Sequence, residues 1–182
     1  DEKRYLNLEK LLNKYGTNKF IGADVSGSIF EPACHLRSVE NVLCDLVNES
    51  KEIEILFDKI TEFTETVALN SLKRGANWIW LGDDIGTQQG MIMSPRMWRQ
   101  YLKPRLKRII NKIRNYNSET YIAYHSCGGI YPVIKDLIEI GIDALNPIQP
   151  TAKGMDIFKI KEEFGSKLTL ICGLDTQNFM VE

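Results

Sequence analysis

The fold is decided by the stretch TYIAYHSCGGIYPVIKDLIEIGIDALNP, residues 120–147. Its apolar periodicity predicts a strand over 120–128, a helix over 130–140 and a short strand over 143–147. A strand, a helix and a second strand in this order are typical of a parallel sheet covered by helices. Both strands end in polar residues, HSCG and NP, and the carboxyl ends of parallel strands are where such folds place their chemistry.

The same alternation continues on both sides of this stretch. Pro104 lies inside the helix predicted over 95–116 and predicts a kink there. Further strands are predicted over 77–84 and 168–175, and residues 20–24 are predicted to form a short strand or a loop. Further helices are predicted over 1–15, 38–47, 53–72, 95–116 and 157–164. A closed eight-stranded barrel takes roughly 250 residues, whereas this chain has 182. The chain is therefore either a smaller open sheet or a segment of a longer barrel protein. We favour the segment, that is, an α/β fold of the (β/α)8 TIM-barrel type with only part of the barrel present, and we expect residues 1–182 to form a single domain.

The composition is that of an ordinary globular protein. A hydrophobic share of 43% excludes a disordered chain, and a net charge of −1 argues against nucleic acid as a partner. No apolar run is long enough to span a membrane, and the first residues lack the apolar core of a signal peptide, so we expect a cytoplasmic protein. Four cysteines are too few for a disulfide scaffold, which leaves metal binding or a reactive thiol as their special roles.

The tetrapeptide His125-Ser126-Cys127-Gly128 is the first candidate site. Residues i and i+2 of a strand point to the same side, so His125 and Cys127 offer an imidazole and a thiolate to one point. Zinc accepts nitrogen and sulfur ligands, and Cys172, at another strand end, is a candidate third ligand. The alternative is a buried, hydrogen-bonded histidine beside small structural cysteines.

The loop GDDIGTQQG, residues 82–90, is the second candidate site. We assign catalytic roles to Asp83, Asp84 and Gln88, because paired carboxylates bind cations, orient a histidine or act as general acid and base. The alternative is that an aspartate caps the loop. Substrate-binding roles are assigned to polar residues at the later strand ends, namely Asn146, Asp175 and Gln177.

A run of eight basic residues without an acid lies between Arg96 and Arg114. It predicts a solvated outer helix face or, alternatively, a surface for an acidic protein partner.

Three segments together carry a family resemblance. They are GDDIGTQQGMIMSPRMWRQYLKPRLKRII (82–110), YHSCGGIYPVIKDLIEIGIDALNPIQP (124–150) and LTLICGLDTQ (168–177). In content and order they resemble the uroporphyrinogen decarboxylase superfamily, which includes uroporphyrinogen decarboxylases and cobalamin-dependent methyltransferases. The resemblance implies a (β/α)8 barrel. It also implies that His125 and Cys127 are zinc ligands, with a third cysteine beyond Glu182 or with Cys172 in its place.

The activity that the resemblance implies is methyl transfer. A zinc-bound thiol would receive a methyl group from a methyl-corrinoid (cobalamin) presented by a partner protein, with Asp83, Asp84 and Gln88 on the adjacent rim. The alternative is a carboxy-lyase, a cofactor-free uroporphyrinogen decarboxylase that acts on tetrapyrrole carboxylates in porphyrin biosynthesis. A third alternative is a non-catalytic family member that covers its core by pairing with another chain, for instance as a homodimer.

Overall fold

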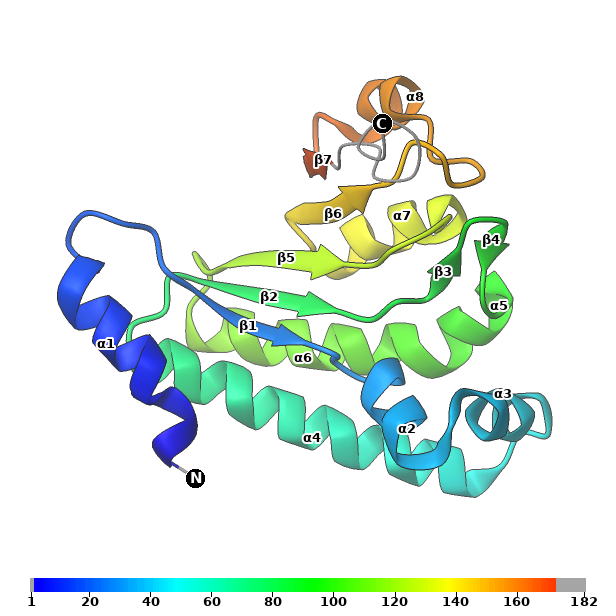
Figure 1. Cartoon of the computed structure of the whole chain (residues 1–182), viewed down its shortest axis with the longest axis horizontal. Helices are drawn as coiled ribbons and strands as arrows, with labels where there is room; N and C mark the ends of the chain where they lie inside the picture. Colours follow the sequence, from blue (N-terminus) through cyan, green and yellow to red (C-terminus); the bar gives the residue numbers. More distant parts are fainter. Residues whose placement is uncertain (1, 173–182) are drawn as a thin grey trace, which may run out of the picture.

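The computed structural model describes residues 2–172, and of Cys172 it describes only the backbone. Five strands form one sheet in the order β1-β2-β5-β6-β7, and every neighbouring pair is parallel. Their bounds are β1 Gly22–Ser26, β2 Trp78–Gly82, β5 Tyr121–His125, β6 Ala144–Ile148 and β7 Thr169–Cys172. The expected partial barrel of parallel α/β type is thereby confirmed (Figure 1).

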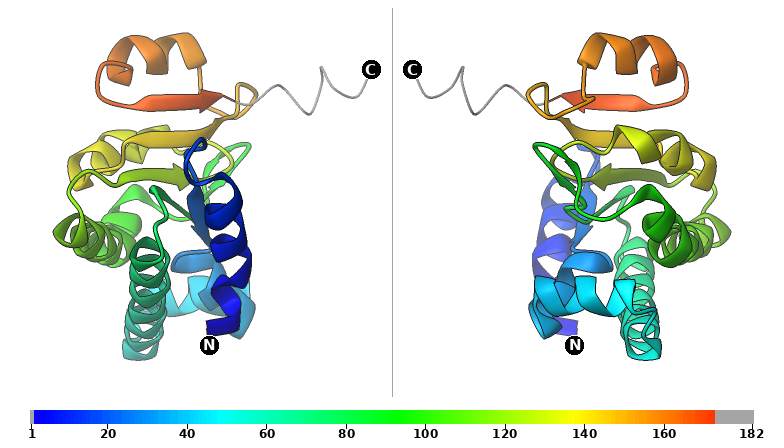
Figure 2. Two further views of the ribbon diagram at one scale, coloured as in Figure 1. Left: turned by 90° about the vertical axis from the view of Figure 1, so that its left-hand side faces the viewer. Right: turned by 90° about the vertical axis from the view of Figure 1, so that its right-hand side faces the viewer.

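Helices connect the strands and bury their apolar faces against the sheet. Figure 2 shows α4, α6 and α7 on one side of the curved sheet, while the other side is largely open in the described part of the chain. The helices of the amino-terminal half are α1 Leu6–Tyr15, after a 3-10 turn over Glu2–Tyr5, then α2 Phe30–Arg37, α3 Val39–Val47 and α4 Lys51–Lys73. Those of the second half are α5 Pro95–Met97, α6 Lys103–Tyr116, α7 Tyr131–Ile140 and α8 Ile157–Phe164.

Local sequence explains where the long helices begin and end. The Ser50 hydroxyl accepts a hydrogen bond from the Ile53 backbone N–H at the start of α4. Gly75 follows the C-cap residue of α4, and its φ of +104 is a backbone conformation that favours glycine. Between these ends α4 buries an apolar stripe that includes Phe57 and Ala68, both with no exposed surface. Burying a phenylalanine side chain contributes roughly 1.5–3 kcal/mol.

The structure adds three features that the periodicity did not predict. Helix α2 has no apolar stripe to mark it, and the short antiparallel pair β3 Gly86–Thr87 and β4 Gly90–Met91 lies within the predicted loop. The expected kink takes the form of a π-helical turn over Trp98–Leu102, directly before Pro104 at the start of α6. A π-helical turn is rare, and where it occurs it is mostly a single turn within an α-helix.

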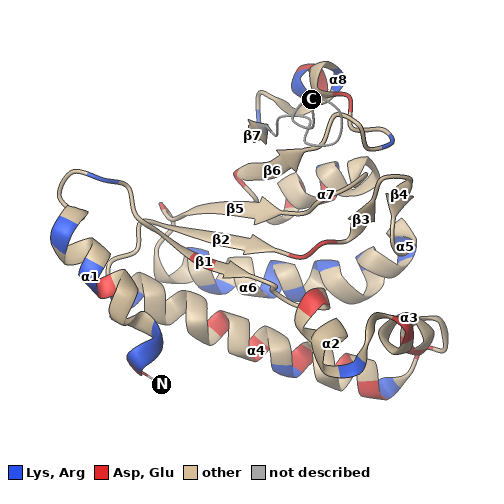
Figure 3. Cartoon of the chain, viewed as in Figure 1, with Lys and Arg blue, Asp and Glu red and all other residues tan. Residues whose placement is uncertain are grey.

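The basic run on α6 is paired within the chain. Arg105 and Arg108 bind Asp58 and Glu65 of α4 at 2.7 Å, and Lys103 binds Asp136 of α7 at 2.6 Å. Figure 3 shows the basic positions of α6 beside the acidic positions of α4. These three ion pairs therefore join α6 to its neighbouring helices. The sequence predicted a solvated face or a surface for an acidic partner, and neither prediction describes these three residues.

No helix among residues 2–172 combines the length and the apolar character needed to cross a membrane.

Candidate metal centre

Three side chains with metal-binding atoms meet at the carboxyl ends of β2 and β5. Asp84 follows β2 by two residues, His125 is the last residue of β5, and Cys127 comes two residues later. One ligand atom from each lies within 4.8 Å of the others. His125 Nε2 is 3.6 Å from Cys127 Sγ and 3.5 Å from Asp84 Oδ1. Two of the three sequence-predicted ligands, His125 and Cys127, thus come together with one of the predicted catalytic carboxylates, Asp84.

These separations suit a tetrahedral metal ion. With Zn–N and Zn–O bonds of about 2.0–2.1 Å and a Zn–S bond of about 2.3 Å, two ligand atoms at the tetrahedral angle lie about 3.3–3.6 Å apart. The measured 3.5 and 3.6 Å agree with this range. Nitrogen, sulfur and carboxylate oxygen are also the ligand types that zinc accepts. The residues present therefore fit a zinc ion.

Asn146 orients the imidazole of His125. The register of the sheet places Asn146 of β6 opposite His125, and its Oδ1 lies 2.7 Å from His125 Nδ1. The other end of this amide donates from Nδ2 to the Ile171 carbonyl oxygen of β7 at 3.5 Å, which fixes the oxygen toward the histidine. An oxygen acceptor keeps the proton of neutral His125 on Nδ1, so the lone pair of Nε2 faces Cys127 and Asp84.

The electrostatics at Cys127 favour the neutral thiol when no cation is present. Burial and the neighbouring negative charge of Asp84 raise the pKa of the Cys127 thiol to about 11. The Cys127 backbone N–H donates to Asp84 Oδ1 at 2.8 Å, so the carboxylate stays beside the sulfur. A metal cation at this position would oppose both effects, because it stabilises the thiolate and neutralises the carboxylate.

A tight glycine contact holds the loop that carries Cys127. Gly128, at φ +83, packs so closely on the β3–β4 hairpin that an added Cβ atom would lie 2.4 Å from the Gly86 carbonyl carbon. The next residue, Gly129, donates its backbone N–H to the Thr87 carbonyl oxygen at 2.9 Å. The hairpin therefore fixes the backbone immediately after the cysteine.

Gln88 lies in a second polar group beside this loop. Its Nε2 donates to Gln149 Oε1 at 3.3 Å, and the same oxygen accepts the Gly128 backbone N–H at 2.6 Å. Sequence reasoning did not single out Gln149. Its signal was its place two residues after the predicted strand that ends in Asn146 and Pro147.

Asp83 is not brought to the cluster. Its buried carboxylate accepts backbone N–H groups of Ile29 and Glu31, both at 2.9 Å, and so caps the start of α2. Burial raises the pKa of Asp83 to about 7, and these N–H groups oppose the shift. Of the two adjacent aspartates, the structure gives Asp83 the capping role and turns Asp84 toward His125.

The remaining predicted residues lie at the carboxyl end of the sheet or beyond the described residues. Cys172 ends β7 opposite Ile148, so its backbone shares the sheet edge with Asp84, His125 and Asn146, as expected for parallel strands. Asp175 and Gln177 lie outside the described residues.

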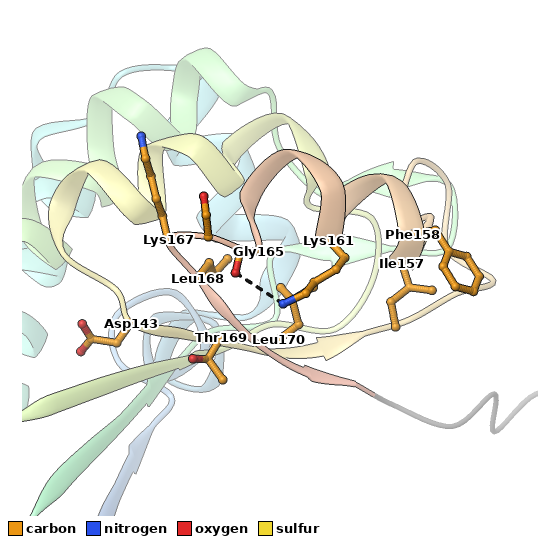
Figure 4. Close-up of a pocket in the computed structure, with 10 residues that line it drawn as sticks. Asp143, Ile157, Phe158, Lys161, Gly165, Lys167, Leu168, Thr169 and Leu170 are labelled. Atoms are coloured by element: carbon orange, nitrogen blue, oxygen red, sulfur yellow. Dashed lines mark hydrogen bonds between the residues drawn. The ribbon is translucent and has the colours of Figure 1, made fainter.

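A pocket of about 670 Å³ lies away from the cluster, between α8 and β7. Figure 4 shows its lining, which includes Asp143, Phe158 and Lys161. Because none of the three cluster residues lines it, this pocket has no part in the candidate metal centre.

The fold and the cluster define a class of protein: an α/β chain of the barrel type with a candidate transition-metal centre at the carboxyl ends of its strands. The profile of the uroporphyrinogen decarboxylase (URO-D) family matches residues 10–181. The chain belongs to the URO-D family, which confirms the resemblance carried by its sequence.

A solved structure of a methyltransferase from Methanosarcina mazei is similar to the chain, with a TM-score of 0.72 and 23% sequence identity. The similarity covers 90% of this chain and 45% of that chain, so this chain spans less than half the length of that protein. At this identity the likeness establishes the fold. No curated protein sequence matches the chain.

Proposed function

We propose that the chain forms the metal-binding part of a zinc-dependent methyltransferase. In this reaction a thiol takes a methyl group from a methyl-corrinoid that a partner protein presents. The observation that carries the proposal is the cluster of Asp84, His125 and Cys127, whose ligand atoms lie within 4.8 Å of one another. Membership of a family with both methyltransferases and decarboxylases, and a fold shared with a methyltransferase, are consistent with it.

Each residue of the cluster has a separate task. His125 presents Nε2 because Asn146 holds the proton on Nδ1, and Cys127 presents its sulfur from a loop fixed by the hairpin. Asp84 uses Oδ1 to accept the Cys127 backbone N–H, and its side chain is 44% exposed, so Oδ2 is able to take the proton of an incoming thiol and release it to water. When bound, zinc supplies the positive charge that keeps a thiol deprotonated at neutral pH.

The second candidate is the cofactor-free decarboxylase, which the description of the matched family favours. In that reaction Asp84 would bind the pyrrole N–H groups of a tetrapyrrole, and Cys127 would have no chemical role. The two candidates therefore differ in what they require of the cysteine.

Metal binding by the purified chain tests the proposal. We expect about one equivalent of zinc or Co²⁺ per chain, and Cys127→Ala should lose most of it, since removing a ligand greatly lowers affinity. Cys44→Ala, which removes an exposed thiol on α3, is the matched control and should bind as the unaltered chain does. The proposal would be overturned in favour of the decarboxylase by two results together. The unaltered chain would stay metal-free after growth in zinc-replete medium and convert uroporphyrinogen, and Cys127→Ala would convert it equally well.

A further inference from the structure

Loops from three strand ends meet at one side-chain oxygen. Gln149 directly follows β6, and its Oε1 accepts the Gly128 backbone N–H of the loop after β5 at 2.6 Å. The same oxygen accepts Gln88 Nε2 of the β3–β4 hairpin, which follows β2, at 3.3 Å. The Thr151 hydroxyl donates to Gln88 Oε1 at 3.5 Å, which keeps the nitrogen of the Gln88 amide toward Gln149. The half-buried Gln149 side chain therefore joins the loops after β2 and β5 to the end of β6.

The Gly128 N–H belongs to the peptide group that follows Cys127. On the other side of the cysteine, the Cys127 N–H donates to Asp84 Oδ1 at 2.8 Å. Side-chain oxygens thus accept the N–H groups on both sides of the Cys127 Cα atom, which fixes the direction of its Cα–Cβ bond. The sulfur at the end of this side chain lies 3.6 Å from His125 Nε2. The Gln149 contact is therefore one of two hydrogen bonds that set the position of the sulfur.

The conformation of Gly128 gives this hydrogen bond its importance. The φ of Gly128 is +83, and glycine enters this region as readily as the ordinary one. The hairpin contact limits how far Gly128 can move, but a residue without a side chain does not select the direction of its own N–H. Gln149 selects it with a neutral acceptor, so the loop is held without a second negative charge beside that of Asp84.

Other contacts between these loops do not depend on Gln149. The Gly129 N–H donates to the Thr87 carbonyl oxygen, and the Lys153 N–H donates to the Gln88 carbonyl oxygen, both at 2.9 Å. Removing the Gln149 amide leaves these backbone hydrogen bonds in place. The loops then stay attached to one another, and the effect is confined to the two groups that donate to Oε1.

We propose that Gln149 is a positioning residue for Cys127, because its Oε1 holds the Cys127–Gly128 peptide group in the orientation that directs the sulfur toward His125 Nε2. This rests on the proposed function, in which Cys127 binds zinc. In this role Gln149 acts through the Gly128 backbone, and the metal bonds come from the cluster. Partners that orient metal ligands in this way commonly change metal affinity 10–100-fold when they are removed.

Gln149→Leu tests the role, because leucine is similar in size and has no acceptor. Co²⁺ affinity is measured by titration, and the thiolate-to-cobalt absorption band per bound ion reports the bond to the Cys127 sulfur. We expect the dissociation constant to rise about 10–100-fold and the band to weaken. Gln149→Glu keeps an oxygen acceptor at the same reach and should restore the band. Gln89→Leu makes the same change at an exposed position of the hairpin turn and should bind as the unaltered chain does.

The absorption band separates positioning from a general loss of stability. A merely structural role would lower the urea midpoint and leave the band of the bound ion unchanged. If Co²⁺-loaded Gln149→Leu has the band and the affinity of the unaltered chain, the positioning role is refuted while the proposed function stands, because both chains still bind the metal.

A second measurement does not depend on the metal. Hydrogen exchange of the Gly128 amide is followed by NMR in the metal-free chain. We expect exchange about 2–12-fold faster in Gln149→Leu, as for the loss of one hydrogen bond, and no change in Gln149→Glu or Gln89→Leu. If the unaltered chain gives no cobalt band but this difference is present, the proposed function fails and the role of Gln149 in holding the loop is retained. Equal Gly128 exchange in Gln149→Leu and the unaltered chain overturns the inference.

Discussion

Replacing Gly128 by alanine tests whether the hairpin contact holds the metal-binding loop. Gly128 has φ +83, and an added Cβ atom would lie 2.4 Å from the Gly86 carbonyl carbon and 2.5 Å from the Thr87 nitrogen. Gly154 is a matched control. Its φ of +81 is nearly the same, but the nearest atom to its added Cβ is Tyr131 Cβ at 3.5 Å, an ordinary contact.

The difference in unfolding free energy between Gly128→Ala and Gly154→Ala measures how much the close contact between Gly128 and the β3–β4 hairpin contributes. Both variants lose about 1–2 kcal/mol of unfolding free energy, because alanine is disfavoured at positive φ. In Gly128→Ala the hairpin must also move by about 1 Å to reach a normal contact distance, since backbone atoms have no rotamer to relieve the overlap. That movement breaks the hydrogen bonds from Gly129 to Thr87 and from Gly128 to Gln149, each worth about 0.5–1.5 kcal/mol. We therefore expect Gly128→Ala to lose about 2–5 kcal/mol of unfolding free energy in total.

Urea unfolding and a Co²⁺ titration of both variants provide the assay. Gly154→Ala should bind Co²⁺ as the unaltered chain does, whereas Gly128→Ala should bind it more weakly because Cys127 is displaced. Equal unfolding free energies for the two variants, or unchanged Co²⁺ affinity in Gly128→Ala, would refute the reasoning.

Two further predictions follow from the polar contacts. Asn146→Ala should lower zinc affinity about 10–100-fold, measured by competition with a chelating dye, because His125 loses the acceptor that fixes its tautomer; unchanged affinity would remove Asn146 from the site. At Asp136 burial raises the pKa, but hydrogen bonds and charges from Arg99 and Lys103 outweigh it and hold the pKa below its ordinary value. The resulting stabilisation is therefore present above about pH 4 and is lost as the pH falls further. Asp136→Asn should cost about 1–3 kcal/mol at pH 7, and its urea midpoint should fall less steeply below pH 4 than that of the unaltered chain; parallel curves would contradict this.

The sequence by itself determined the order of the sheet strands and of the long helices between them, and the edge of the sheet where the chemistry lies. Each predicted strand ends in polar residues, and in a parallel sheet all such ends lie together, so His125 and Asn146 had to meet once the strands were parallel. The pairing of His125 with Cys127 was also local, because residues two apart in an extended segment share a side. Short-range periodicity carries this information without any knowledge of the tertiary structure.

The tertiary structure decided which partner each polar side chain found. Asp83 and Asp84 are adjacent and chemically identical, and only the position of α2 shows that Asp83 caps a helix while Asp84 turns to His125. The basic run on α6 has no acid within it, and its partners lie on α4 and α7, dozens of residues away. Such contacts depend on how separate elements pack together, and a local pattern of side chains does not specify that packing.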